Sequence, residues 1–262
     1  MFTINPFSGL TDLISPLSMQ VYVIVMVLLV IGGTVLDLIH KKSAQYFFKN
    51  AERAKAEATK ELSSGDKASI AFKTVAEDVL TSAEFCNLNR RLAHLLTMYG
   101  FILFVATTAI MIFGYADVAT PAYLPMIWHI GALMLCVGGY WFWFFIRVDV
   151  AAEGNRWYRV MRADLFVLSL LATATFALIW SALQAAGVAG WSTLFFGLFI
   201  LANTVLFGGV LWSKFAHMFF KPAAAFQKRI AKADGSRDRL PEPADAPEQY
   251  GPGIKRLLPR NY

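Results

Sequence analysis

The fold is decided by a long uncharged stretch in the second half of the chain. Residues 165–213 read LFVLSLLATATFALIWSALQAAGVAGWSTLFFGLFILANTVLFGGVLWS and contain no Asp, Glu, Lys or Arg. A helix needs about 20 apolar residues to cross the hydrocarbon core of a bilayer, so this stretch is too long for one span. The segment Gly187-Val-Ala-Gly190 divides it as a tight turn. We therefore expect two membrane-spanning helices joined by that turn.

The composition of the whole chain points the same way. Of its 262 residues, 57% are hydrophobic and only 16% are charged, whereas an average soluble domain has about 25% charged residues. This excludes disordered, collagen-like and disulfide-scaffold classes and argues against an ordinary soluble enzyme. Because a bilayer offers no hydrogen-bond partners to the backbone, each crossing segment should be a helix. The predicted fold class is an all-α integral membrane bundle of five transmembrane helices, at about residues 17–39, 95–115, 122–146, 165–186 and 191–213.

The basic residues predict which face of the membrane is cytoplasmic. All 24 Lys and Arg residues lie in three windows, at 41–91, 147–162 and 214–260. Five spans place these windows on one side, which is cytoplasmic by the positive-inside rule. We expect the N-terminus outside, the C-terminus in the cytoplasm and, in a bacterial host, a multi-pass protein of the inner membrane. The net charge of +6 then reflects topology, and no nucleic-acid partner is expected.

Most of the mass outside the membrane is predicted to be cytoplasmic. The loop 41–93 is rich in Ala, Lys and Glu and predicts two helices, broken at Ser63-Ser-Gly-Asp66. It is either a solvated excursion or a platform for a partner. The tail contains a segment, 241–253, that is too rich in Pro for a helix. Apolar residues after it favour docking over disorder. The predicted domains are the N-terminus with the first span, 1–40; the loop, 41–93; a four-helix membrane region, 94–222; and a docking tail, 223–262.

Sequence motifs for nucleotide and metal chemistry are missing. Cys86 and Cys136 form no Cys-x-x-Cys pair, so the chain is not expected to hold an iron–sulfur cluster, a structural zinc or a disulfide of its own. There is no Walker motif and no glycine-rich dinucleotide fingerprint. Ionisable residues are nearly absent from the spans, which argues against a transporter or a proton pump. No catalytic residue is assigned.

Histidine is the residue type that remains as a candidate cofactor ligand. His40, His94 and His217 lie at span ends that face the predicted cytoplasm. A b-type haem in a helical bundle needs two imidazoles from different helices, and His94 and His217 are the best pair. His40 is an alternative ligand, and Arg91 and Lys214 are placed to neutralise the haem propionates. The alternative, that these histidines are polar anchors at headgroup depth, stays open.

His129 lies apart from the other histidines, toward the predicted outer face. It suits a hydrogen-bond donor in a quinone site or a residue of the interfacial aromatic belt. The aromatic run Tyr140-Trp-Phe-Trp-Phe-Phe145 also fits such a belt, with Arg147 as an anchor. Its alternative role is an apolar wall for a quinone ring.

Several strings of the sequence resemble a known family of membrane redox subunits. The spans, the topology and the histidines on the second and fifth helices are similar to the cytochrome-b-type gamma subunits of respiratory nitrate reductase. They also resemble the membrane subunits of heterodisulfide reductase and of the quinone-interacting oxidoreductase complex, and in particular the membrane anchor of dissimilatory adenylylsulfate reductase. The resemblance covers residues 17–222 and is carried by RRLAHLLTMYGF at 90–101, WHIGA at 128–132, RVDV at 147–150 and SKFAHMFFKP at 213–222.

The resemblance implies a membrane anchor that transfers electrons between the quinone pool and a cytoplasmic iron–sulfur flavoprotein, adenylylsulfate reductase. It further implies a b haem. The nitrate reductase subunits carry two histidines on each of the second and fifth helices, whereas the deeper positions here hold apolar residues such as Phe104 and Phe199. One haem or none is therefore expected. The alternative is a haem-free docking anchor for a cytoplasmic redox complex.

Overall fold

The computed structural model describes residues 1–11, 13–41, 43–83, 85, 87–116, 118–147, 156, 158–213, 215 and 217–237, without the side chains of 41, 43, 44, 217 and 219. These residues form helices and turns, and no strand occurs among them. They belong to two compact units. The membrane unit comprises Met1–Asp37 and Leu92–Ala216, and the charged unit comprises Leu38–Arg91 and His217–Tyr262.

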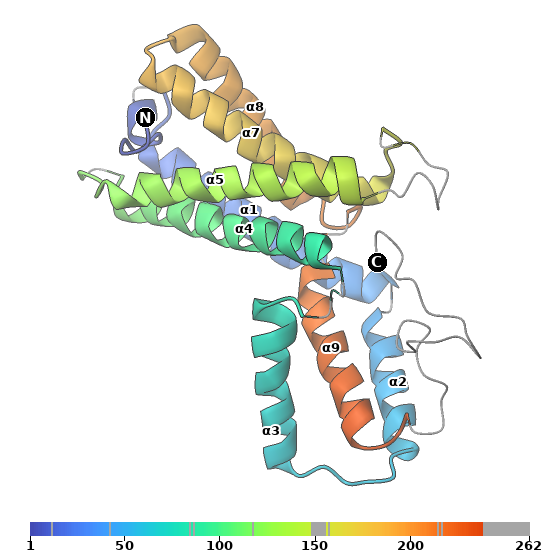
Figure 1. The fold of residues 1–262 in the computed structure, drawn as a ribbon. Helices are drawn as coiled ribbons and strands as arrows, with labels where there is room; N and C mark the ends of the chain where they lie inside the picture. The colour runs from blue at the N-terminus through green and yellow to red at the C-terminus, as the bar shows by residue number, and fades with distance from the viewer. Residues whose placement is uncertain are drawn as a thin grey trace. The chain divides into compact units, whose positions relative to one another are not determined.

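Within the described residues, five helices are long and apolar enough to cross a membrane, which confirms the predicted class (Figure 1). The protein is thus a multi-pass membrane protein. The crossing stretches are Pro16–His40, Leu88–Gly114, Tyr123–Ile146, Arg162–Ala185 and Ala189–Gly208. They correspond to α1 (Pro16–Lys41), α4 (Leu88–Gly114), α5 (Tyr123–Trp141) with the π-helix η3 (Phe142–Ile146), η4 (Arg162–Asp164) with α7 (Leu165–Ala185), and α8 (Ala189–Gly208).

The turn between α7 and α8 lies where the sequence places it. Gly187 has a φ of +73°, a conformation that a residue with a side chain rarely adopts. At its far end α8 stops at Gly208, before the predicted end at Ser213. Two consecutive glycines, Gly208 and Gly209, explain the early end, because glycine is the weakest helix former after proline.

Helices α4 and α5 are in backbone contact. A Cβ atom added to Gly100 would lie 2.8 Å from the carbonyl oxygen of Gly131, and one added to Gly138 would lie 2.7 Å from that of Ala93. Small residues at such crossings let membrane helices approach closely. The close van der Waals contact stabilises the helix pair, because the hydrophobic effect does not drive association between helices inside a bilayer.

The N-terminal segment before α1 packs against the connection between α4 and α5 and against the end of α7 next to the α7–α8 turn. It contains a short 3-10 helix, η1 (Ser8–Leu10). Asn5 Nδ2 donates to Thr120 Oγ1 at 2.9 Å, and Gln184 Nε2 donates to the carbonyl of Pro6 at 3.0 Å. Figure 1 shows the N-terminus beside this end of α7 and α8.

The charged unit consists of helices from two distant parts of the chain. They are α2 (Ser43–Ala56), α3 (Ser64–Lys73) continued by the π-helix η2 (Thr74–Leu80), and α9 (His217–Ala233). α9 packs against each of the others. Ser63 begins α3 with a capping box: its Oγ accepts from the Asp66 N–H, and the Asp66 carboxylate accepts from the Ser63 N–H. The loop thus forms helices on both sides of a break, but the break covers residues 57–63, and Ser64, Gly65 and Asp66 of the predicted break already belong to α3.

Helix α9 corrects the predicted start of the tail. The boundary between residues 222 and 223 falls inside this helix, so residues 223–233 are helical. Pro222 lies inside the helix and removes one backbone hydrogen bond, but the Ala- and Lys-rich stretch after it favours helix formation. The Pro-rich part of the predicted docking tail, residues 241–253, lies outside the described residues.

Candidate functional site

The structure divides the predicted haem ligands between the two units. His94 is an exposed residue of α4 in the membrane unit. His40 is exposed near the end of α1 and belongs, with His217, to the charged unit. His217 is the first residue of α9, but its side chain and the whole of Lys214 lie outside the described part of the chain. The pairing of His94 with His217 therefore stays a prediction.

Arg91, the other predicted propionate partner, stabilises the connection between η2 and α4. Its Nε donates to the carbonyl of Thr81 at 2.7 Å. Asn87 begins α4 beside it, because its Oδ1 accepts from the N–H groups of Asn89 and Arg90 at 2.9 and 3.2 Å. Arg91 is thus held at the start of the helix that carries His94, and its contact with a propionate stays a prediction.

His129 is fully buried in the membrane unit and both of its ring nitrogens are used. Nδ1 lies 2.6 Å from the carbonyl oxygen of Pro125, one helical turn earlier, and Nε2 lies 2.8 Å from Ser181 Oγ on α7. A carbonyl oxygen can only accept, so Nδ1 carries the hydrogen and Nε2 accepts from the serine hydroxyl. A quinone or a metal ion would have to displace one of these partners. These contacts favour a structural role for His129.

Aromatic rings enclose His129 on several sides. Phe2 and Trp128 contact it edge-on, with ring centroids 5.0 and 4.9 Å away. Phe7, from the N-terminal segment, packs edge-on against both Trp128 and Trp180. We call these rings the aromatic cluster: Phe2, Phe7, Phe104, Trp128, Trp180, Phe196 and Phe199.

The two deep apolar positions singled out in the sequence belong to this cluster. Phe104 is stacked on Trp128 at 5.0 Å, and Phe199 is stacked on Trp180 at 5.5 Å. Packed rings therefore occupy both of these positions. Among the described residues, no group of three or more His, Cys, Asp and Glu side chains is placed to hold a metal ion.

An ion pair joins the ends of α5 and α7 in the membrane unit. Arg147, just after the π-helix η3, forms a two-pronged contact with Asp164, with its Nε 2.9 Å from Oδ1. The two side chains are only 8% and 12% exposed. The guanidinium also lies over the ring of Trp143, 4.2 Å from the centroid. Trp143, which belongs to the aromatic run before Arg147, thus contacts the guanidinium of this ion pair. The sequence did not predict this contact.

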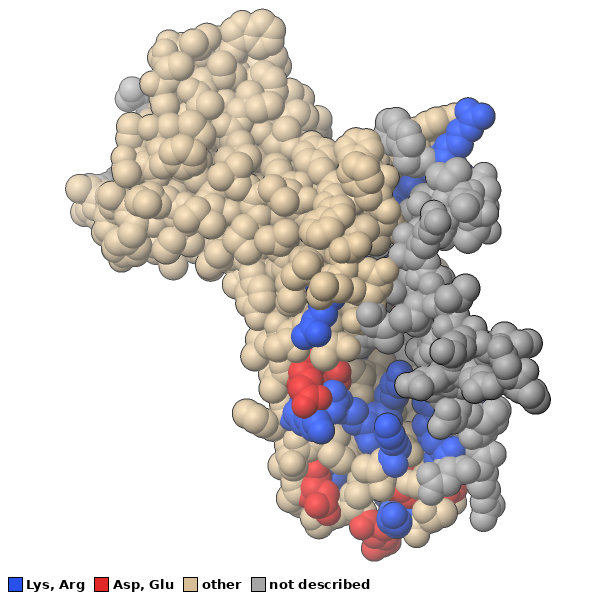
Figure 2. Space-filling view, viewed as in Figure 1, with Lys and Arg blue, Asp and Glu red and all other residues tan. Residues whose placement is uncertain are grey.

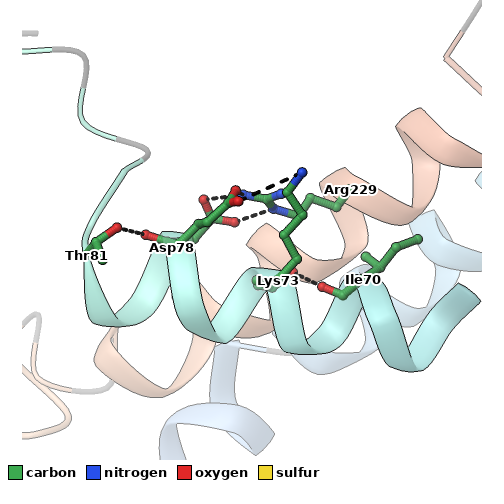
Figure 3. A network of polar contacts seen from close by, with 7 residues as sticks. Ile70, Lys73, Asp78, Thr81 and Arg229 are labelled. Carbon is green, nitrogen blue, oxygen red and sulfur yellow. Dashed lines mark hydrogen bonds and ion pairs between the residues drawn. The ribbon is translucent and has the colours of Figure 1, made fainter.

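The charged unit carries most of the visible ionic side chains, as Figure 2 shows over α2, α3 and α9. Its central contact joins α9 to η2 (Figure 3). Arg229 donates from Nε and Nη2 to the two oxygens of Asp78, at 2.5 and 2.9 Å, and from Nη2 to Glu77 Oε2 at 2.8 Å. The hydrogen bonds to Asp78 and then Glu77 raise the pKa of Arg229 above its ordinary value. Sequence reasoning missed this contact, because nothing in the order of residues pairs these charges.

Comparisons of the chain with protein-family models, with curated proteins and with solved structures find no match.

Proposed function

We propose that this chain is the membrane-anchoring subunit of an oxidoreductase complex, which holds a soluble iron–sulfur flavoprotein at the membrane. The observation that carries the proposal is the charged unit, in which residues 43–80 and 217–233 pack together instead of forming separate solvated loops. By the positive-inside rule, its basic residues favour the cytoplasmic side of the inner membrane, with the N-terminus outside.

Exposed aromatic residues on the charged unit support a docking role. Phe72 on α3 is 77% exposed, and Tyr46 and Phe48 on α2 are 64% and 63% exposed. Aromatic residues are enriched in protein–protein interfaces, whereas a solvated helix gains nothing from them.

The redox part of the proposal rests on the sequence resemblance. It makes adenylylsulfate reductase the partner, an enzyme that interconverts sulfite and AMP with adenylylsulfate. His94 and His217 would hold one b haem, with Arg91 and Lys214 at its propionates and His40 as an alternative ligand. The haem would supply one-electron transfer between the partner and the quinone pool.

The second candidate function is a haem-free docking anchor. It is favoured by the contacts of His129, whose two nitrogens bond Pro125 and Ser181, and by the packed rings at Phe104 and Phe199. In this case any quinone reaction takes place in the partner.

A reduced-minus-oxidised absorption spectrum of the purified full chain distinguishes the two candidates. A b-type band that disappears in both His94→Ala and His217→Ala, and persists in the control His40→Ala, supports the redox subunit and its ligands. Loss in His40→Ala instead identifies His40 as a ligand. A folded wild type without a band leaves the haem-free anchor.

The docking role has its own test. The wild-type chain in nanodiscs should bind purified adenylylsulfate reductase in a sedimentation assay, whereas empty nanodiscs should not. Phe72→Glu should weaken this binding, because it puts a charge into an apolar contact. Binding to empty nanodiscs as strong as to the loaded ones would contradict the anchor.

A further inference from the structure

A short basic segment leads into the fourth membrane helix and belongs to the membrane unit. The structure describes it at residues 156 and 158–162, which we call the arginine segment. It contains Arg156, Arg159 and Arg162, and all three are exposed. Residues 154–163 contain no Asp or Glu. None of the functions proposed above uses this segment.

The helix that follows indicates the depth of the arginine segment in the membrane. α7 is 21 residues long and contains no charged residue. At 1.5 Å per residue it is about 31 Å long, which matches the roughly 30 Å of the hydrocarbon core. Arg162 lies three residues before Leu165, the first residue of α7. We therefore expect the arginine segment at the level of the lipid phosphates.

Hydrogen bonds hold the backbone of this segment at the end of α7. Asp164 Oδ2 accepts from the Met161 N–H at 2.8 Å, and the Asp164 N–H donates to the Met161 carbonyl at 2.9 Å. Arg147 donates from Nη2 to the carbonyl of Arg159. Because the backbone is already fixed, binding of a ligand to the arginine side chains costs little further ordering of the chain.

The acidic residue next to the segment does not repel an anion. Asp164 is paired with Arg147, and the two side chains are only 12% and 8% exposed. The pair is neutral as a whole, so the charge of the three exposed arginines is not cancelled by it. A guanidinium matches the geometry of a phosphate group and binds it with two parallel hydrogen bonds. The exposed charge of the segment therefore favours a phosphate.

Apolar side chains alternate with the arginines along the segment. Tyr158, Val160 and Met161 are 52%, 60% and 52% exposed. Arg156 lies over the ring of Tyr158, 5.7 Å from its centroid, and donates to the hydroxyl of Tyr158. Such residues gain nothing from water, but at a membrane surface they enter the boundary between headgroups and acyl chains. Basic and apolar side chains together match a lipid better than a free anion.

We propose that the arginine segment binds the headgroup of an anionic phospholipid. Arg159 and Arg162 bind the phosphate, while Val160 and Met161 contact the start of the acyl chains. A zwitterionic headgroup is a weaker ligand, because its ammonium group is repelled by the arginines. Phosphatidylglycerol, whose headgroup has no cation, is therefore the probe of choice, and phosphatidylcholine is the comparison.

The experiment titrates the delipidated full chain, in an uncharged detergent, with each lipid and counts bound lipid by native mass spectrometry. The wild type should bind phosphatidylglycerol more tightly than phosphatidylcholine. A basic residue near an anionic lipid surface strengthens binding about fivefold. Arg162→Gln should therefore weaken phosphatidylglycerol binding about fivefold, and Arg159→Gln combined with Arg162→Gln about twentyfold. The matched control combines Lys67→Gln with Lys73→Gln, which removes two charges from exposed positions of α3 in the charged unit.

Four results would overturn the proposal. Equal phosphatidylglycerol binding by the wild type and by both arginine variants, with unchanged melting temperatures, would show that the segment is not the site. Equal binding of phosphatidylcholine would show that anionic lipid is not selected. An equal loss in the lysine control would show that only the total charge matters. Inorganic phosphate that displaces the lipid at equal concentration would identify a site for the free anion.

Discussion

Arg229 on α9 and Asp78 on η2 meet through two hydrogen bonds, although 151 residues separate them in the chain. The first residue comes after the last membrane helix and the second comes between the first two. Their contact joins the loop 41–93 to the residues after the last membrane helix. Both segments are predicted to be cytoplasmic, and they form one unit.

Arg229→Met should loosen the charged unit without affecting the membrane unit. A two-pronged Arg–carboxylate contact is stronger than a simple surface ion pair, but it is partly exposed here, so we expect a loss of about 1–2 kcal/mol. Hydrogen exchange of the α9 and η2 amides in the full chain measures it. Lys73→Met is the control, because Lys73 lies 3.8 Å from Glu77 at an exposed position. A double-mutant cycle with Asp78→Asn that shows no coupling would contradict the assignment.

The start of α3 should depend on pH through Asp66. Its hydrogen bonds from the Ser63 side chain and backbone lower the pKa of its carboxyl group below the ordinary value of 3.8. A lowered folded-state pKa means that this stabilisation is present above the unfolded-state pKa and is lost as the pH falls through the folded-state value. The protection of the amides at residues 63–66, measured relative to their intrinsic exchange rates at each pH, should therefore fall below about pH 4. Asp66→Asn should remove this pH dependence; an unchanged profile would count against the capping box.

Ser181→Ala should destabilise the membrane unit. It leaves His129 Nε2 as a buried acceptor without its donor, which costs about 1–3 kcal/mol. Thermal unfolding in detergent measures the loss. Ser169→Ala, whose hydroxyl bonds only the carbonyls of Leu165 and Phe166, should be close to neutral. If the proposed haem band is present, Ser181→Ala should leave it unchanged; a lost band in folded protein would make His129 a candidate ligand.

Gly138→Ala should lower the melting temperature of the protein more than Gly197→Ala does. The new methyl group at Gly138 would lie 2.7 Å from the Ala93 carbonyl oxygen, a rigid backbone atom, so α4 and α5 must separate. Overpacking of this kind costs about 1–3 kcal/mol. At Gly197 nothing lies within 4 Å, and alanine should be neutral or mildly stabilising. Equal melting temperatures for the two variants would argue against the close helix contact.

The sequence predicts the membrane helices well because hydrophobic length is a local property. The turn at Gly187 and the break before α3 also follow from local signals, namely glycine conformation and a capping box. The end of α8 and the extent of α9 were harder to predict, because tandem glycines end α8 early and α9 continues through Pro222.

The contacts that define candidate sites could not be predicted, because they join distant parts of the chain. Ser181 bonds His129 and Arg147 bonds Asp164 only after the helices pack.

The position of Phe7 has a consequence for biogenesis. This ring precedes the first membrane helix, yet it packs against Trp180 on the fourth. The segment before α1 must therefore wait, across the insertion of three further spans, before its final neighbours exist. Completion of the membrane unit is thus tied to late events at the ribosome, and a fault in the fourth span should expose this segment to proteolysis.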